Sequence, residues 1–193
     1  MQLRNIFLAA ILVAAPRLSA TVITYGGALS GSNENPTVIT PGTGFAVVTI
    51  DDVLNTMHLV ISFSGLTSTD TGAHIHCCVA QGGNTGVATT VPAFTGFPLG
   101  VTAGSYNQTL SLTDLASYNP SFVTAQGGLA NAEAALLAGL AAHQTYLNIH
   151  TANNPGGEIR AFLVPIPEPA TWGFVGLAVA GLALFGRKRR ISD

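Results

Sequence analysis

Glycine and proline residues divide the stretch from Thr21 to Pro165 into short segments. The chain of 193 residues contains 22 glycines and 10 prolines, and the segments between them are rich in Val, Ile, Thr and Phe. Short segments of this composition, bounded by turn residues, are typical of β-strands. The sequence therefore predicts an all-β fold, a single antiparallel β-sandwich.

Several segments also show the period-two alternation of a strand. Leu59, Ile61 and Phe63 lie on one side of their segment, with His58, Val60 and Ser62 on the other. Because successive side chains of a strand point to opposite faces, one face of each such strand belongs to a core. The predicted strands are residues 22–29, 44–51, 57–63, 73–79, 87–91, 108–112, 145–151 and 158–164.

One segment, residues 131–142, breaks the β pattern because it is rich in Ala and Leu. It begins with Asn131, a favoured N-cap residue, and Glu133 lies where the helix dipole favours an acid. We therefore expect one short helix inserted among the strands. A second helical turn is expected over residues 113–118.

The N-terminal segment, residues 1–20, has the order of a secretory signal peptide. Arg4 precedes an apolar run over residues 6–15, and Pro16 and the small residues Ser19 and Ala20 follow. A short basic region, an apolar region and small residues direct a chain out of the cytoplasm and are then removed. We expect cleavage near Ala20.

The C-terminal segment, residues 166–193, is predicted to be a second targeting segment. Residues 170–186 carry no charge, a length near the lower limit for a transmembrane helix. The basic residues 187–190 follow directly and favour the cytoplasmic side of the membrane. The sequence thus predicts one domain, residues 21–165, that lies in the periplasm and is anchored to the inner membrane.

This exported region is acidic and has very few cations. Between Thr21 and Val164 the only basic residue is Arg160, against seven acidic residues. A nucleic-acid partner is excluded for this region, because binding to phosphates requires several cations.

Two histidines, His74 and His76, are expected to share one face of a strand. Alternate residues of a strand lie about 7 Å apart on the same side, so the two imidazoles can chelate one metal ion. Cys78 continues this face, whereas Cys77 lies on the opposite one.

A second polar group lies on a predicted hairpin whose turn is Asn-Asn-Pro-Gly-Gly. One strand offers Asn148 and His150, and the other offers Glu158 and Arg160. If this face meets His74 and His76, the three histidines form a zinc or copper site, with Cys78 and Glu158 as further ligands. The alternative is a structural polar network in which Glu158 and Arg160 form an ion pair.

Cys77 and Cys78 are the only cysteines. Export permits their oxidation, so a vicinal disulfide, soft metal ligands and bridges between chains are all open alternatives, and the pair is also a candidate redox sensor. The sequence contains no nucleophile elbow, phosphate-binding loop or dinucleotide motif, and we assign no catalytic residues.

The exported region resembles the CHRD (chordin-type) domain family. The resemblance implies a β-sandwich that works outside the cytoplasm, and it leaves the role of the histidine motifs open. The blocks that carry it are residues 29–36, 44–46, 63–66, 73–76, 146–151 and 155–160.

The C-terminal segment resembles a PEP-CTERM sorting signal. Pro167, Glu168 and Pro169 precede the apolar stretch and the basic cluster in the order of that signal. This resemblance implies a Gram-negative bacterium and processing near this motif by an exosortase-type membrane enzyme. It also implies that the helix is a temporary anchor.

We therefore hold two hypotheses of function. The first is a non-catalytic binding or structural module, sorted to the cell surface or to an exopolysaccharide matrix. The second is a copper- or zinc-binding protein, or a metal-dependent redox enzyme, that uses His74, His76 and His150.

Overall fold

The structure, a computed structural model, describes residues 22–166 of the chain. The expected signal peptide, Pro-Glu-Pro motif and C-terminal helix lie outside these residues. Within them, no helix is long and apolar enough to cross a membrane. The strands are β1 (Val22–Ser30), β2 (Thr43–Asp51), β3 (Thr56–Ser64), β4 (Asp70–Cys77), β5 (Gly104–Ser111), β6 (Thr145–Thr151), β7 (Ile159–Phe162) and β8 (Val164–Pro165).

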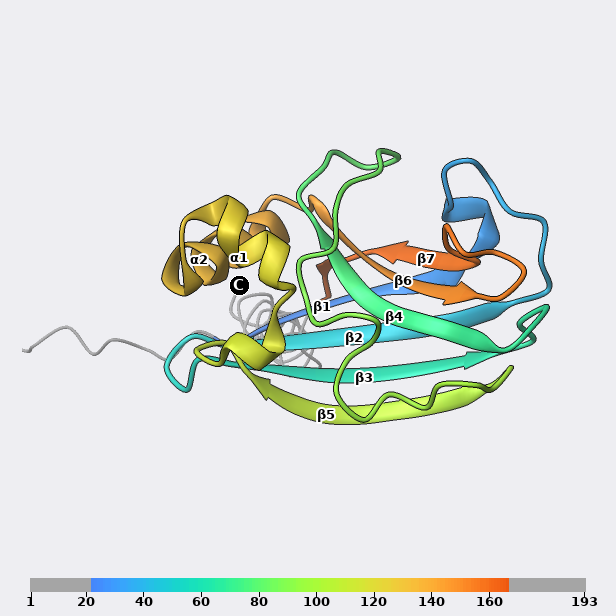
Figure 1. Ribbon diagram of the computed structural model, residues 1–193, viewed down its shortest axis with the longest axis horizontal. Helices are drawn as coiled ribbons and strands as arrows, with labels where there is room; N and C mark the ends of the chain where they lie inside the picture. Colours follow the sequence, from blue (N-terminus) through green and yellow to red (C-terminus); the bar gives the residue numbers. More distant parts are fainter. Residues whose placement is uncertain (1–21, 167–193) are drawn as a thin grey trace, which may run out of the picture.

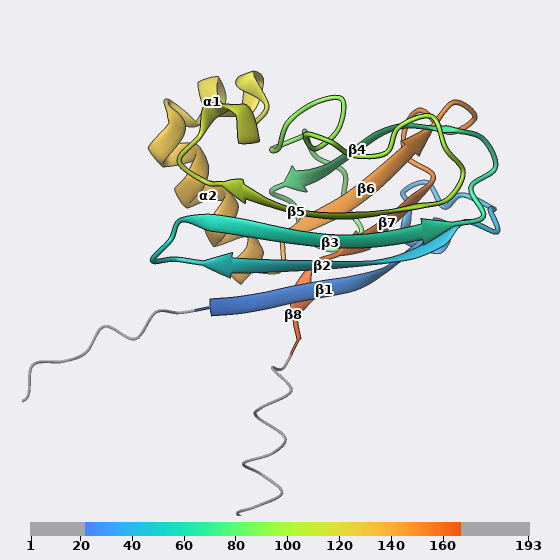
Figure 2. The same cartoon turned by 90° about the horizontal axis from the view of Figure 1, so that it is seen from below.

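The strands form one antiparallel sheet in the order β4-β6-β7-β1-β2-β3-β5, with β8 on β1 (Figure 1). This confirms the all-β class. Figure 2 shows β1, β2, β3 and β5 as one layer and β4, β6 and β7 as the other. The two layers expected of a sandwich are thus parts of one curled sheet, in which Ser30 and Arg160 are the paired residues of β1 and β7.

The end of β7 approaches β1 so closely that a side chain would not fit between them. A Cβ atom on Gly27 would lie 2.6 Å from the carbonyl oxygen of Phe162. The glycine therefore allows the sheet to curl at this point.

The core lies between the two layers and is built by the expected alternation. On β3, Met57, Leu59, Ile61 and Phe63 are buried, and the residues between them are not. They pack in one cluster with side chains from the opposite layer, namely Ala73, Ile75, Leu147, Ile149, Ile159 and Ala161.

Strands β4 and β6 differ from β3 because both of their faces are covered. His74, His76 and Asn148 point away from the core, yet all three side chains are buried. Connecting segments cover this face: His76 bonds to the backbone oxygen of Thr85, His150 to that of Pro155 in the turn after β6, and Arg160 on β7 to that of Asn33. The outer face of this layer is therefore a second buried region, and it is polar.

The strand predicted over residues 87–91 is not present. Val87 forms an isolated bridge to His76 of β4 and Thr89 forms one to Tyr118, and the side-chain hydroxyl of Thr89 accepts the backbone N–H of Ile75. Pro92, which has no N–H, follows directly. A regular ladder is therefore interrupted.

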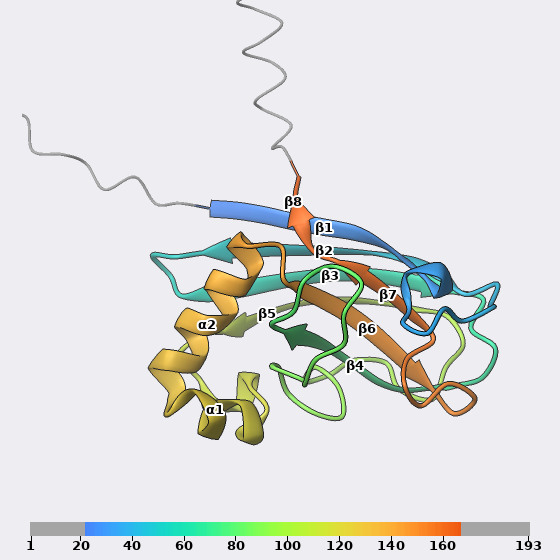
Figure 3. The same cartoon turned by 90° about the horizontal axis from the view of Figure 1, so that it is seen from above.

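Two α-helices lie at one end of the sheet (Figure 3), where one was expected. They are α1 (Pro120–Gln126) and α2 (Leu129–Ala141), and α2 begins after Gly128 rather than at Asn131. The side chain of Asn131 bonds to the carbonyl of Gln126 instead of capping a helix. The expected turn at 113–118 is present as a 3-10 helix, Leu115–Ser117, and a further one spans Gly31–Asn33.

The turn between β6 and β7 is tied to two other loops by Glu158, which is fully buried. Its carboxylate accepts hydrogen bonds from the hydroxyls of Thr40, Thr67 and Thr151, from the Thr67 backbone N–H and from the Asn154 amide. Burial alone would raise the pKa of Glu158, but the bonds from Thr151, Thr40 and Thr67 outweigh it and hold the pKa below its ordinary value.

We predict that Glu158→Gln lowers the free energy of unfolding at pH 7 by about 1–3 kcal/mol, because an ionised acceptor is lost. A depressed carboxyl pKa stabilises the folded state above the ordinary pKa of 4.5 and ceases to do so as pH falls through the folded pKa. The difference between wild type and variant should therefore shrink as pH falls below 4.5. Urea unfolding at several pH values measures it. Glu133→Gln on α2 is the control, and a wild-type advantage that persists unchanged in acid would contradict this account.

Candidate metal centre

The pairing of β4 with β6 brings the three predicted histidines together. His74 and His76 lie on the outer face of β4, and their partners on β6 are Asn148 and Tyr146. The partner of His150 is Gly72, which has no side chain. His150 therefore faces its diagonal neighbour, His74.

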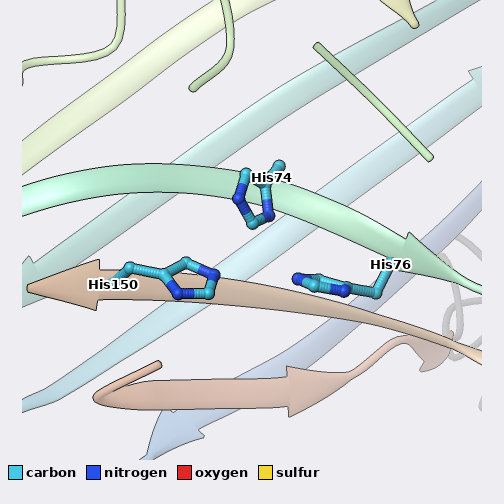
Figure 4. Close-up of side chains that lie close together, drawn as sticks. All are labelled: His74, His76 and His150. Atoms are coloured by element: carbon cyan, nitrogen blue, oxygen red, sulfur yellow. The ribbon is translucent and has the colours of Figure 1, made fainter. Parts of the chain in front are cut away.

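The three rings converge on one point (Figure 4). Each histidine offers one ring nitrogen, and these nitrogens all lie within 4.8 Å of one another. The ring centroid of His74 lies 4.8 Å from that of His76 and 4.6 Å from that of His150. In Figure 4, nitrogens of His76 and His150 point toward each other beside His74.

One nitrogen of each ring is buried without a hydrogen-bond partner: Nδ1 of His74, Nε2 of His76 and Nε2 of His150. The other nitrogen of two rings is held by the backbone. His76 Nδ1 lies 2.7 Å from the Thr85 carbonyl oxygen, and His150 Nδ1 lies 2.9 Å from that of Pro155. Because a carbonyl only accepts, these two Nδ1 atoms carry the proton, and each Nε2 keeps its lone pair.

The site favours neutral imidazoles. Burial lowers the pKa of His74 to about 3, and the neighbouring His150 and His76 add to this shift. Burial lowers the pKa of His76 to about 4, although its bond to Thr85 acts in the opposite direction. Burial also lowers the pKa of His150. Neutral rings with free lone pairs are the form in which histidine binds metals.

The additional ligands considered for this site are not part of it. The cluster of potential ligand atoms within residues 22–166 contains the three histidines, without Cys78 or Glu158. Cys77 and Cys78 are bonded to each other, so neither offers a thiolate. Their role as a redox sensor stays a prediction.

The expected ion pair between Glu158 and Arg160 is not present. Glu158 lies before β7 begins at Ile159, so the strand alternation that suggested the pair does not extend to it. The carboxylate beside Arg160 is that of Glu34, with Nε and Oε2 3.7 Å apart and both side chains buried. Sequence reasoning missed Glu34, although it belongs to the first block of the family resemblance.

The ring of Tyr146 contacts both Arg160 and one of the three histidines, His76. The guanidinium carbon of Arg160 lies 4.7 Å from the Tyr146 ring centroid, and that ring stacks on His76 at 4.5 Å. Arg160 also bonds to the backbone oxygens of Asn33 and Gly83 and to the Asn84 side chain. Burial raises the pKa of Glu34 to about 7, against the lowering effects of Arg160 and Asn148.

Comparison with known protein families gives one match for the domain and another for the C-terminal segment. The PEP-CTERM protein-sorting motif matches residues 165–190, which contain Pro167, Glu168 and Pro169. The protein is therefore exported and sorted to the cell envelope by exosortase-type processing. No curated protein and no solved structure is significantly similar to it. The CHRD domain matches residues 25–163, which is more than half of the chain, and the chain belongs to the CHRD domain family.

Proposed function

We propose that the domain is a non-catalytic module of the bacterial envelope that binds one transition-metal ion at His74, His76 and His150. The observation that carries this proposal is that ring nitrogens of three histidines lie within 4.8 Å of one another, in rings that each keep one buried nitrogen without a partner. A buried polar atom without a partner costs about 1–3 kcal/mol, and one bound ion would satisfy all three.

The donor set indicates the class of metal. Imidazole nitrogen suits zinc and copper, and both accept three histidine ligands. The carbonyls of Thr85 and Pro155 act as outer partners, because each fixes the tautomer and orientation of a ligating ring. Metal–nitrogen bonds of 2.0–2.1 Å require the nitrogens to lie about 3.5 Å apart. The rings would therefore move closer together on binding.

A metal-dependent redox enzyme is the second candidate. The number of protein ligands favours this candidate, because a catalytic metal with three protein ligands keeps a further coordination position for water or substrate. Two observations favour a binding role instead. The three free nitrogens are buried, and the carboxylates of Glu34 and Glu158, which could act as acids or bases, are engaged with Arg160 and with the threonine hydroxyls.

The proposed route to the envelope uses both ends of the chain. The N-terminal signal peptide starts export, and the C-terminal helix then anchors the domain at the periplasmic side of the inner membrane. Processing at the Pro-Glu-Pro motif would release it to the cell surface or to an exopolysaccharide matrix.

We predict that the full-length protein binds about one zinc or copper ion per chain and that its melting temperature rises with that metal. A ligand that binds only the folded state at 100 times its Kd stabilises it by about 2.7 kcal/mol. Elemental analysis and thermal melts measure both quantities. The use of wild-type protein with and without a chelator makes the test independent of any variant.

The matched variants are His76→Gln and His150→Gln, with His58→Gln as control. His58 lies in the other layer and bonds to Asn107. The first two should lose more than about 100-fold in metal affinity, since even outer partners of a site contribute 10- to 100-fold, and the control should lose nothing. Equal binding by all three would contradict the proposed site. Turnover that disappears in a folded His74→Ala variant would favour the enzyme.

We also predict that the mature protein isolated from its native envelope is trimmed at both ends. Cleavage is expected near Ala20 and near Pro167–Pro169, which mass spectrometry of the intact protein measures directly. Recovery of the unprocessed chain from the cytosol would contradict the proposed route.

A further inference from the structure

The ligand set of the proposed metal site carries no negative charge. The three ligands are neutral imidazoles, and the cluster includes no carboxylate or thiolate from residues 22–166. Zinc or Cu(II) in this set would therefore keep its full double charge unless an anion from solution joined it.

A positively charged side chain close to the site also opposes the binding of a cation. The positive charge of Arg160 acts on His76, and the Tyr146 ring contacts both side chains. The buried acid beside it, Glu34, is paired with Arg160 and does not belong to the ligand cluster. The surroundings therefore offer no excess negative charge to a metal ion.

Because the site is buried, the charge of the bound ion has a large effect on its binding free energy. The side chains of His74 and His76 are buried, and the three free nitrogens are shielded from solvent. The Born cost of burial grows with the square of the charge, so a divalent ion costs about four times as much as a monovalent one. Copper is among the metals that imidazole suits, and Cu(I) is its monovalent form, for which three ligands make a complete trigonal set.

We propose that the three-histidine site selects copper as Cu(I) over zinc and over Cu(II). This inference rests on the proposed metal-binding function and names the metal and its oxidation state. Three neutral donors complete a trigonal Cu(I) centre, which needs neither a charged ligand nor water.

The test compares metals on the full-length protein. Cu(I) affinity is measured anaerobically with ascorbate against bathocuproine disulfonate, and Zn(II) affinity against a zinc chelator. We expect Cu(I) to bind at least about tenfold more tightly than Zn(II), because less charge is buried. Copper-loaded protein should also remain free of a Cu(II) electron paramagnetic resonance signal in air.

A charge variant tests the cause. Asn148 lies opposite His74 on the same face, so Asn148→Asp would place a carboxylate beside the site. We expect it to shift the ratio of Cu(I) to Zn(II) affinity toward zinc by about tenfold or more. Asn107→Asp, beside His58 in the other layer, is the matched control and should leave the ratio unchanged.

The outcomes separate the two proposals. Failure of the wild type to bind either metal overturns the metal-binding function itself. Tighter binding of Zn(II) than of Cu(I), or a stable Cu(II) signal, overturns only the choice of Cu(I). An unchanged ratio in folded Asn148→Asp contradicts the charge argument. If that variant does not fold, the wild-type comparison alone decides.

Discussion

The outer face of β4 and β6 is buried, although its side chains are polar. Polar groups removed from water must bind one another or a ligand. In an ordinary curled sheet this face would contact solvent, and His74, His76 and Asn148 would need no partners. Because loops cover them here, each nitrogen and oxygen on this face has an energetic consequence.

Much of this face is satisfied by the protein itself. On the neighbouring strand β7, Arg160 joins two other segments of the chain through the backbone oxygens of Asn33 and Gly83. The Nδ1 atoms of His76 and His150 are fixed by carbonyls in the same way. These bonds hold two of the three rings in place, and ring nitrogens of the three histidines lie within 4.8 Å of one another before any ion binds. Such preorganisation lowers the cost of binding.

Local patterns predicted the strands and the shared face of the histidines. The alternation in β3 identified its core side, and the spacing of His74 and His76 placed both rings on one face of β4. Their meeting with His150 depended on the pairing of β4 with β6, which was a conjecture from sequence. The partner of Arg160 could not be found in this way, because Glu34 lies far away along the chain and no local rule connects them.

The predictions for residues 87–91 and for helix α1 differ from the structure for local physical reasons. The segment at 87–91 has strand composition, yet a threonine hydroxyl replaces a backbone partner there. Helix α1 was missed although Asn119 and Pro120 form a typical helix start, an N-cap followed by proline at the first helical position. Composition thus identified the class of fold, whereas pairing across the molecule determined the site.

The decisive measurement on this site identifies the nitrogens that hold the metal. Long-range proton–nitrogen NMR of the metal-loaded protein, with a diamagnetic ion, reports each imidazole nitrogen separately. We expect the metal to shift the signals of Nδ1 of His74 and of Nε2 of His76 and His150, while the Nδ1 protons of His76 and His150 are retained. Unchanged signals from these rings, with shifts confined to the other two histidines of the chain, His58 and His143, would overturn the proposed ligand set.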